Sequence, residues 1–137
     1  MTFDLDSEVV AGFGFTWRQF LRLPMWQICV APEQDQMVNI LRLVPILTMV
    51  RDHYQKHLRI TSGLRPDLYN KAIGGASKSY HIVGKAVDFM VDGVSSNDVR
   101  LWLAPQLDKL GIRMEDASTP HVHIDMGIVT GGRYFVP

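Results

Sequence analysis

The sequence predicts an α+β fold in which N-terminal helices pack on a small, mainly antiparallel sheet. Two observations support this prediction. Apolar residues in the first half of the chain recur at three- and four-residue steps, which is the helical period, whereas the second half holds short apolar runs separated by glycine and proline. Helices that gather early and strands that gather late are typical of the α+β class.

Two helices are expected in the first half. Thr16 is a suitable N-cap for a short helix that runs to about Leu23 and stops before Pro24. A longer amphipathic helix is expected over residues 33–58, because its apolar residues fall on one face. Pro45 lies within that segment and is expected to kink the helix or divide it in two, since proline lacks the N–H group that a helix interior uses.

The second half is expected to form strands around one further helix. A short strand over residues 58–61 is followed by a long loop rich in glycine and proline, and residues 85–91 are apolar on both faces, as in a buried central strand. A helix that begins at Ser95 should end at Gly111, because glycine is the usual C-terminal residue of helices. The last two strands are expected at residues 112–114 and 121–126.

Composition limits the possible functions. A chain of 137 residues suits a single domain, residues 1–137, with a substantial hydrophobic core. The 14 basic residues equal the 14 acidic ones, so the formal net charge is zero, and no basic run marks a nucleic-acid binder. Neutrality also argues against a general attraction to anionic membranes. We expect a monomer that binds no nucleic acid and inserts into no membrane.

The cysteine count and the first residues bear on location. Cys29 is the single cysteine, so no intramolecular disulfide forms, and its apolar neighbours favour a small core residue. Residues 1–10 are acidic and lack the basic start and apolar centre of a signal peptide. No segment reaches the roughly 20 apolar residues of a membrane span. We therefore expect the chain to be cytoplasmic as synthesised.

Histidines and aspartates in the second half form the candidate site. Asp88 falls inside the predicted buried strand, where an ionised carboxylate without a partner is strongly unfavourable. A metal ion would be a suitable partner, and His81 stands at the end of the preceding loop. In the last predicted strand, alternation places His121, His123 and Asp125 on one face. Two imidazoles and one carboxylate with an open fourth position are the usual ligands of a catalytic zinc ion.

Each of these motifs also has a less specific interpretation. A His-x-His pair alone is often a polar strand face, and a lone aspartate is often a turn residue, but their presence in one domain favours a metal site. His53 and His57 lie four residues apart in the long predicted helix. Their neighbours are polar, so we interpret this pair as part of a solvated face and exclude it as the site.

Five motifs follow one another in the second half of the chain in an order that resembles a known family. They are Thr-Ser-Gly-Leu-Arg-Pro (61–66), Tyr-Asn (69–70), Gly-Gly-Ala (74–76), Ser-x-His-x-x-Gly-x-Ala-x-Asp (79–88) and His-Val-His-Ile-Asp-x-Gly (121–127). The chain resembles the zinc D-alanyl-D-alanine carboxypeptidase family of LAS-type metallopeptidases, which also includes murein endopeptidases and phage endolysins. The resemblance covers about residues 58–135.

The resemblance implies a role for five residues. His81, Asp88 and His123 take the positions of the zinc ligands. Arg65 takes the position of an arginine that grips the carboxylate or carbonyl oxygen of the substrate, for which a guanidinium fork is well shaped. Ser79 takes the position of a hydroxyl near the bound peptide. Without the resemblance, the arginine would be interpreted as a surface loop residue and the serine as a turn hydroxyl.

The catalytic base is the point at which the sequence departs from the family. Some members carry glutamate three residues before the last histidine ligand, where this chain has Pro120. Two residues are candidates instead: Glu115, at the end of the preceding strand, and His121. We expect Glu115 to be the base and His121 to stabilise the oxyanion, while the assignment of His121 as base stays open. Asp125 either orients a ligand histidine or faces solvent.

The resemblance implies a zinc-dependent hydrolase that cleaves amide bonds in peptidoglycan stem or cross-link peptides. It would act on the cell wall after release or delivery, as an endolysin-like endopeptidase in phage lysis or as a D,D-carboxypeptidase. Two other classes stay open. One is an inactive zinc- or peptide-binding module of the same fold, such as a virion component, and the other is a metal-free interaction domain.

Overall fold

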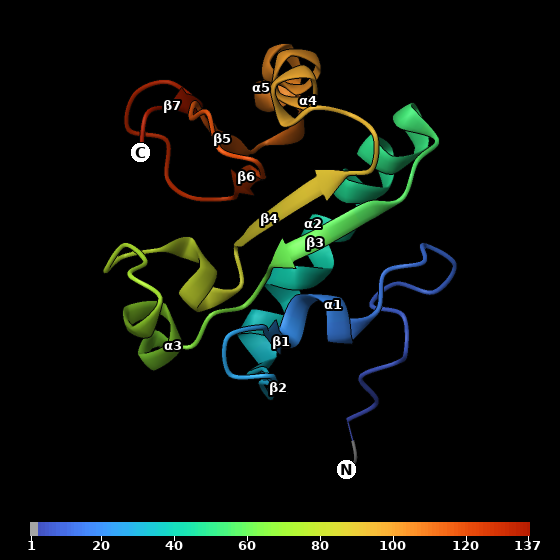
Figure 1. Ribbon diagram of the computed structural model, residues 1–137, viewed down its shortest axis with the longest axis vertical. Coiled ribbons are helices and arrows are strands. Elements are labelled where there is room, and N and C mark those ends of the chain that lie inside the picture. The colour runs from blue at the N-terminus through green and yellow to red at the C-terminus, as the bar shows by residue number, and fades with distance from the viewer. Residues whose placement is uncertain (1–2) are drawn as a thin grey trace.

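A five-stranded sheet is the centre of the computed structural model, which describes residues 3–137 (Figure 1). Its strand order is β3-β4-β6-β5-β7, and neighbouring strands are antiparallel except for the parallel pair β5 and β7. The strands are β3 (Leu58–Ser62), β4 (Ala86–Val91), β5 (Arg113–Glu115), β6 (Val122–Asp125) and β7 (Tyr134–Phe135). The α+β class and the mainly antiparallel sheet are therefore confirmed.

Within residues 3–137, five helices accompany the sheet, and two of them, described below, pack on its central strands. The helices are α1 (Trp17–Leu21), α2 (Gln34–Tyr54), α3 (Asp67–Ala72), α4 (Ser96–Leu103) and α5 (Leu107–Leu110). The long helix α2 contacts β3 and β4, and α4 contacts β4 and β6 (Figure 1). Leu47 of α2, Phe89 of β4 and Ile124 of β6 are fully buried in the core that these elements share. Burial of such side chains contributes about 1.5–3 kcal/mol each.

Two of the predicted helices differ from the structure at a proline residue. Pro45 lies inside α2 without dividing it. The carbonyl that loses its N–H partner is that of Leu41, whose side chain is 47% exposed, so water can satisfy it on that side of the helix. The helix predicted from Ser95 to Gly111 begins as expected, with Ser95 Oγ accepting a hydrogen bond from the Asp98 amide. It is interrupted by a 3₁₀ turn at Ala104–Gln106, which contains a proline near its start.

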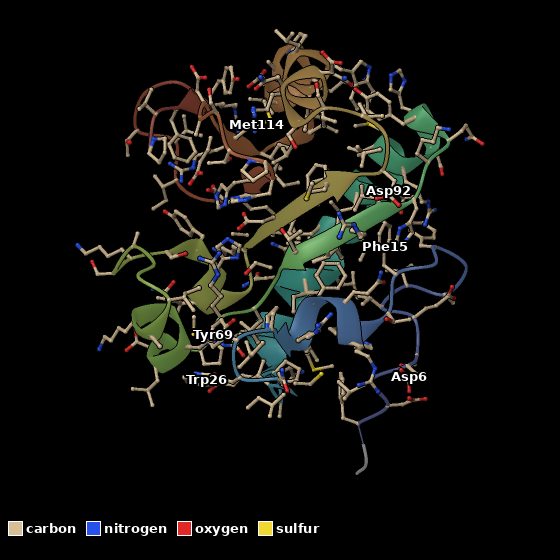
Figure 2. The ribbon with its side chains drawn as sticks, viewed as in Figure 1. Asp6, Phe15, Trp26, Tyr69, Asp92 and Met114 are labelled. Carbon is tan, nitrogen blue, oxygen red and sulfur yellow. The ribbon has the colours of Figure 1, made fainter. Side chains whose placement is uncertain are left out.

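Five elements of the described chain were not predicted. The first helix ends at Leu21 rather than near Leu23, because Arg22–Leu23 forms strand β1, which pairs with β2 (Ile28–Cys29) in a small hairpin. Strand β7 was missed, and the predicted long loop contains α3 and a 3₁₀ helix at Tyr80–Val83. The turn of the hairpin lies against α3, where the rings of Trp26 and Tyr69 pack edge to face with their centroids 4.9 Å apart (Figure 2).

Two smaller expectations concern the membrane and the cysteine. Within residues 3–137, no helix is long and apolar enough to cross a membrane. Cys29 is partly buried, and its side chain packs against the hydrophobic core, as expected for a small apolar residue.

Candidate metal centre and active site

The register of the central strands brings the candidate residues together. On β4 and β6, Asp88 lies directly opposite His123. On β5 and β6, Arg113 lies directly opposite Asp125. Residues opposite each other in an antiparallel pair project to the same face of the sheet. The ladder therefore places the Asp88–His123 pair beside the Arg113–Asp125 pair.

His81 reaches the same place from a tight turn. Its 3₁₀ helix begins after Ser79, whose hydroxyl accepts a hydrogen bond from the His81 amide (3.2 Å), and ends at Gly84, where φ is +77°. A Cβ at Gly84 would lie 2.9 Å from the carbonyl oxygen of Gln36, so only glycine fits this reversal against α2. The turn holds the His81 side chain at 2% exposure, facing Asp88.

The hydrogen bonds of His81 define which of its nitrogens faces the centre. Nδ1 donates to the carbonyl oxygen of Gly63 at 2.8 Å, because a carbonyl can only accept. Nε2 then points at Asp88 Oδ1, 3.2 Å away. The carbonyl is available because Gly63 has no side chain: a Cβ there would lie 2.3 Å from the backbone oxygen of Phe20.

His123 is oriented in the same manner with its nitrogens exchanged. Nε2 lies 2.8 Å from Asp125 Oδ2, and Nδ1 lies 2.8 Å from Asp88 Oδ1. An ionised carboxylate only accepts, so both nitrogens carry a proton in this structure, and Nδ1 is the nitrogen directed to the centre. The two histidines thus aim different nitrogens at one oxygen of Asp88.

This arrangement fits a zinc ion. The donor atoms of His81, Asp88 and His123 all lie within 4.8 Å of one another, and all three residues are buried. Two imidazole nitrogens and one carboxylate oxygen are the ligand types of catalytic zinc sites. Each histidine also donates its other N–H to an oxygen, which is the usual arrangement around metal-ligating histidines.

The same contacts shift the proton affinities of the site. Burial raises the pKa of Asp88, but the hydrogen bonds from His123 and His81 outweigh it and leave that pKa well below the usual value. Burial lowers the pKa of His123, yet its hydrogen bonds with Asp125 and Asp88 raise it to about 9. A metal ion bound at Nδ1 of His123 would therefore have to displace a proton.

Asp125 does not face solvent, which corrects one of the two interpretations of this residue. It is 1% exposed and accepts hydrogen bonds from His123, from the Gly127 amide and, through both oxygens, from Arg113 at 2.7 and 3.0 Å. Burial raises the pKa of Asp125, but the hydrogen bonds from His123 and Arg113 lower it to about 2. The carboxylate is thus ionised and fixed behind His123.

A pocket of about 180 Å³ opens beside the three donors. It is lined by Arg65, Ala76, Ser79, His81, Asp88, Glu115, His121 and His123. Larger cavities elsewhere on the molecule lack acidic and histidine side chains. All seven site residues expected from the sequence therefore line one small cavity.

Arg65 makes more contacts with the protein than the sequence suggested. Its Nη2 donates to Asp88 Oδ2 at 3.1 Å and its Nε to the Ser62 hydroxyl at 2.8 Å, while its amide donates to the His81 carbonyl. The guanidinium therefore holds the outer oxygen of Asp88 while the inner oxygen faces the histidines. Nη1 has no hydrogen-bond partner within residues 3–137.

The two candidate acid–base residues lie at the rim of the pocket. Glu115 Oε1 is 4.0 Å from His123 Nε2, and the Glu115 side chain is 24% exposed. His121 Nε2 is 3.7 Å from Asp88 Oδ2, and the His121 side chain is 34% exposed. Both groups are partly open to solvent and border the same cavity, so either can contact a molecule bound there.

Helix α4 holds the segment that precedes His123. The carbonyl oxygens of Thr119 and His121 accept hydrogen bonds from Arg100, at 3.1 and 3.0 Å, and that of Pro120 accepts from Ser96 at 2.6 Å. Arg100 is 3% exposed and has no carboxylate partner within residues 3–137. Sequence reasoning missed this arginine, because nothing local marks a contact across 21 residues.

The excluded histidine pair lies elsewhere. Helix α2 ends at Tyr54, so His57 stands outside it, where it pairs with Asp92 at a distance of 3.3 Å. His53 stacks on Trp102, with ring centroids 4.0 Å apart. These contacts separate the two imidazoles and agree with the exclusion.

Comparison with known proteins identifies the family. No curated protein matches the chain. A family model described as Peptidase M15 matches residues 21–125, which is more than half of the chain. This range contains the pocket and its three converging donors. The chain belongs to the peptidase M15 family, whose members are zinc-dependent metallopeptidases.

Proposed function

We propose that the protein is a zinc-dependent hydrolase that cleaves amide bonds in the peptides of bacterial peptidoglycan. The observation that best supports this proposal is the convergence of His81 Nε2, His123 Nδ1 and Asp88 Oδ1 beside a pocket whose rim holds a carboxylate and a further imidazole. A structural ion pair would not need two buried histidines with fixed and complementary orientations, whereas a zinc site does.

His81, Asp88 and His123 would hold the metal. Bound there, zinc supplies a Lewis acid that activates water and polarises the scissile carbonyl group. The remaining steps belong to groups of the protein. Arg65 keeps Asp88 in place through its outer oxygen, and Asp125 keeps His123 in place through Nε2.

Glu115 is proposed as the general base. Its carboxylate lies at the rim of the pocket, where Oε1 accepts the proton of the attacking water and then transfers it to the amine nitrogen that leaves. His121 donates its Nε2–H to the carbonyl oxygen as negative charge develops on it. If His121 is instead the base, the oxyanion loses this donor and Glu115 serves only as a polar wall.

Arg65 and Ser79 are proposed to position the substrate. Arg65 offers Nη1 to a carboxylate or carbonyl oxygen of the peptide, since Nε and Nη2 already bind Ser62 and Asp88. The Ser79 oxygen accepts from the His81 amide, which leaves the hydroxyl proton for a peptide carbonyl. The small cavity suits a substrate whose reacting residues have short side chains, such as alanine.

The finer form of the proposal is a wall-lytic enzyme of the endolysin or D,D-carboxypeptidase type. It follows from the motif resemblance and the small pocket. The rival is a module of the same fold that binds zinc or peptide without turnover, which the proline at position 120 keeps open.

The test is digestion of purified peptidoglycan by the zinc-loaded protein, followed by mass spectrometry of the released muropeptides. We expect new fragments that differ from the intact ones by hydrolysis of one amide bond, and about a hundredfold slower release of them with Glu115→Gln. The masses also distinguish loss of a terminal residue from cleavage of a cross-link. Intact peptidoglycan after incubation with protein that holds a full complement of zinc would favour the binding module and refute the enzyme.

A further inference from the structure

Behind the ligand histidine lies an arginine with no assigned role. Arg113 of β5 contacts Asp125 with two parallel hydrogen bonds, Nε to Oδ1 at 2.7 Å and Nη2 to Oδ2 at 3.0 Å. The Arg113 side chain is 14% exposed and that of Asp125 is 1% exposed. A fork-to-fork contact between a buried carboxylate and a partly buried guanidinium is strong and directional, because both ends are fixed in one plane.

Aromatic rings hold the guanidinium in its place. The ring centroid of Phe135, on β7, lies 4.1 Å from Arg113 Cζ, and that of Tyr80 lies 5.2 Å away. The Phe135 ring also meets the His123 ring edge to face at 6.4 Å. Tyr80 directly precedes the ligand His81 in the chain. The arginine thus lies between a ring that contacts His123 and the residue that precedes His81.

One oxygen of Asp125 joins this arginine to the metal centre. Asp125 Oδ2 accepts both from Arg113 Nη2 and from His123 Nε2. With the arginine present, the carboxylate is ionised and turned toward His123. Without it, the carboxylate would be buried with fewer donors and free to rotate away, and the imidazole would lose its fixed orientation.

We infer that Arg113 is a positioning residue for the metal: through Asp125 it orients His123 so that Nδ1 faces the ion. The purely structural alternative is that Arg113 only fastens β5 to β6. The backbone ladder already joins these strands at Arg113–Asp125 and Met114–Ile124, so that task does not require the side chain. The inference rests on the proposed binding of zinc by His123, but it requires no turnover.

The expected effect is on zinc affinity. Loss of a group that orients a metal ligand usually costs about 10- to 100-fold in affinity, and we expect Arg113→Met to raise the dissociation constant for zinc by that factor. Arg113→Lys should lose less, because an ammonium group keeps the charge and one hydrogen bond but not the fork. Phe135→Leu removes the stacked ring while keeping an apolar cover, and should have a smaller effect in the same direction.

A matched control is present on the neighbouring segment. Arg133 pairs with Asp108, which is 96% exposed, and donates to the Ile112 carbonyl, away from the metal centre. Arg133→Met removes the same kind of side chain from the same region. We expect its zinc affinity to stay within about twofold of wild type, since an exposed ion pair contributes little.

The experiment measures zinc binding to the full chain by competition with a chromophoric chelator, with circular dichroism of the chelated samples as a check on folding. In the zinc-loaded protein, NMR should also show a hydrogen-bonded N–H proton on His123 Nε2, which weakens or disappears in Arg113→Met. A merely structural role would leave this signal in place. If Arg113→Met does not fold, Arg113→Lys and Phe135→Leu decide the question.

The outcomes separate this inference from the proposed function. The role of Arg113 would be overturned if Arg113→Met bound zinc within about twofold of the wild-type affinity. The same holds if both Arg113→Lys and Phe135→Leu did so. His123→Ala provides the second arm. If it binds zinc as tightly as wild type does, the proposed ligand set is wrong; if it loses zinc while the Arg113 variants keep it, only the inference fails.

Discussion

Replacement of Asp88 by asparagine separates the contribution of zinc to stability from that of the protein's own hydrogen bonds. The buried carboxylate accepts from Arg65, His81 and His123 at 3.1, 3.2 and 2.8 Å. Asparagine keeps the shape and one acceptor oxygen, but its amide group must face one of these donors. Asp88 is therefore not a charge without partners, and removing zinc alone should not unfold the protein.

The magnitudes follow from these contacts. Breaking a buried charged pair by removing one partner costs about 3–5 kcal/mol, and we expect the lower end, about 3 kcal/mol in chelator, because asparagine retains one acceptor. Zinc at about 1,000 times its dissociation constant stabilises wild type by a further 4 kcal/mol or so. Asp88→Asn lacks the carboxylate ligand and should gain little, so the difference grows to about 7 kcal/mol.

Urea unfolding of both proteins near pH 7, in chelator and in excess zinc, gives the four free energies. A difference that is equal in chelator and in zinc would refute Asp88 as a ligand. No difference in chelator would refute the hydrogen-bond account. Asp92→Asn is the control, because this aspartate is 51% exposed and its pairs with His57 and Arg59 lie on the surface. Its effect should stay within about 0.5 kcal/mol in both conditions.

Three further predictions concern the site. Arg65→Lys should lower turnover of muropeptides by about tenfold or more while zinc content stays near one per chain, because lysine lacks the planar guanidinium that holds Asp88 and faces the substrate. Turnover equal to that of wild type would show that Arg65 does not position the substrate. Glu115→Gln and His121→Ala should each lower kcat about a hundredfold while zinc is retained, and the double variant should lose less than the product of the two factors. Normal turnover of Glu115→Gln together with an inactive His121→Ala would make His121 the base. Burial opposes the raised pKa of His123, about 9 against 6.5, but its hydrogen bonds prevail. The stability that protonated His123 gives the chelated protein through these hydrogen bonds is thus fully present below about pH 6.5 and lost as pH rises through 9. Zinc affinity rises over the same pH interval. If neither the stability nor the zinc affinity changed with pH, the contacts of His123 would be wrong.

The parts of the site that were predictable share a local signal. Asp88 stands out because it interrupts a strand that is apolar on both faces, and His123 stands out because strand alternation pairs it with another histidine. The two residues lie next to each other because β4 pairs with β6 in the register that places Asp88 opposite His123. The fold class was predictable because the helical period dominates the first half of the chain and short apolar runs dominate the second half.

The residues that were missed depend on contacts between distant segments. Arg113 meets Asp125 only because β5 and β6 pair in one register, and Arg100 reaches the Thr119–His121 segment only because of how α4 packs on it. A buried arginine looks the same as an exposed one in a single sequence. The continuity of α2 through Pro45 was likewise set by solvent exposure of one turn, which helical periodicity does not report.

The central claim is that a zinc ion held by His81, Asp88 and His123 is required for amide hydrolysis in peptidoglycan. The most direct measurement follows the mass spectrum of muropeptides through one cycle on a single protein sample: zinc-loaded, stripped by chelator, and reloaded with one equivalent of zinc. The account predicts hydrolysis in the first state, none in the second and recovery in the third. Hydrolysis that persists after metal analysis shows the zinc to be gone would contradict it.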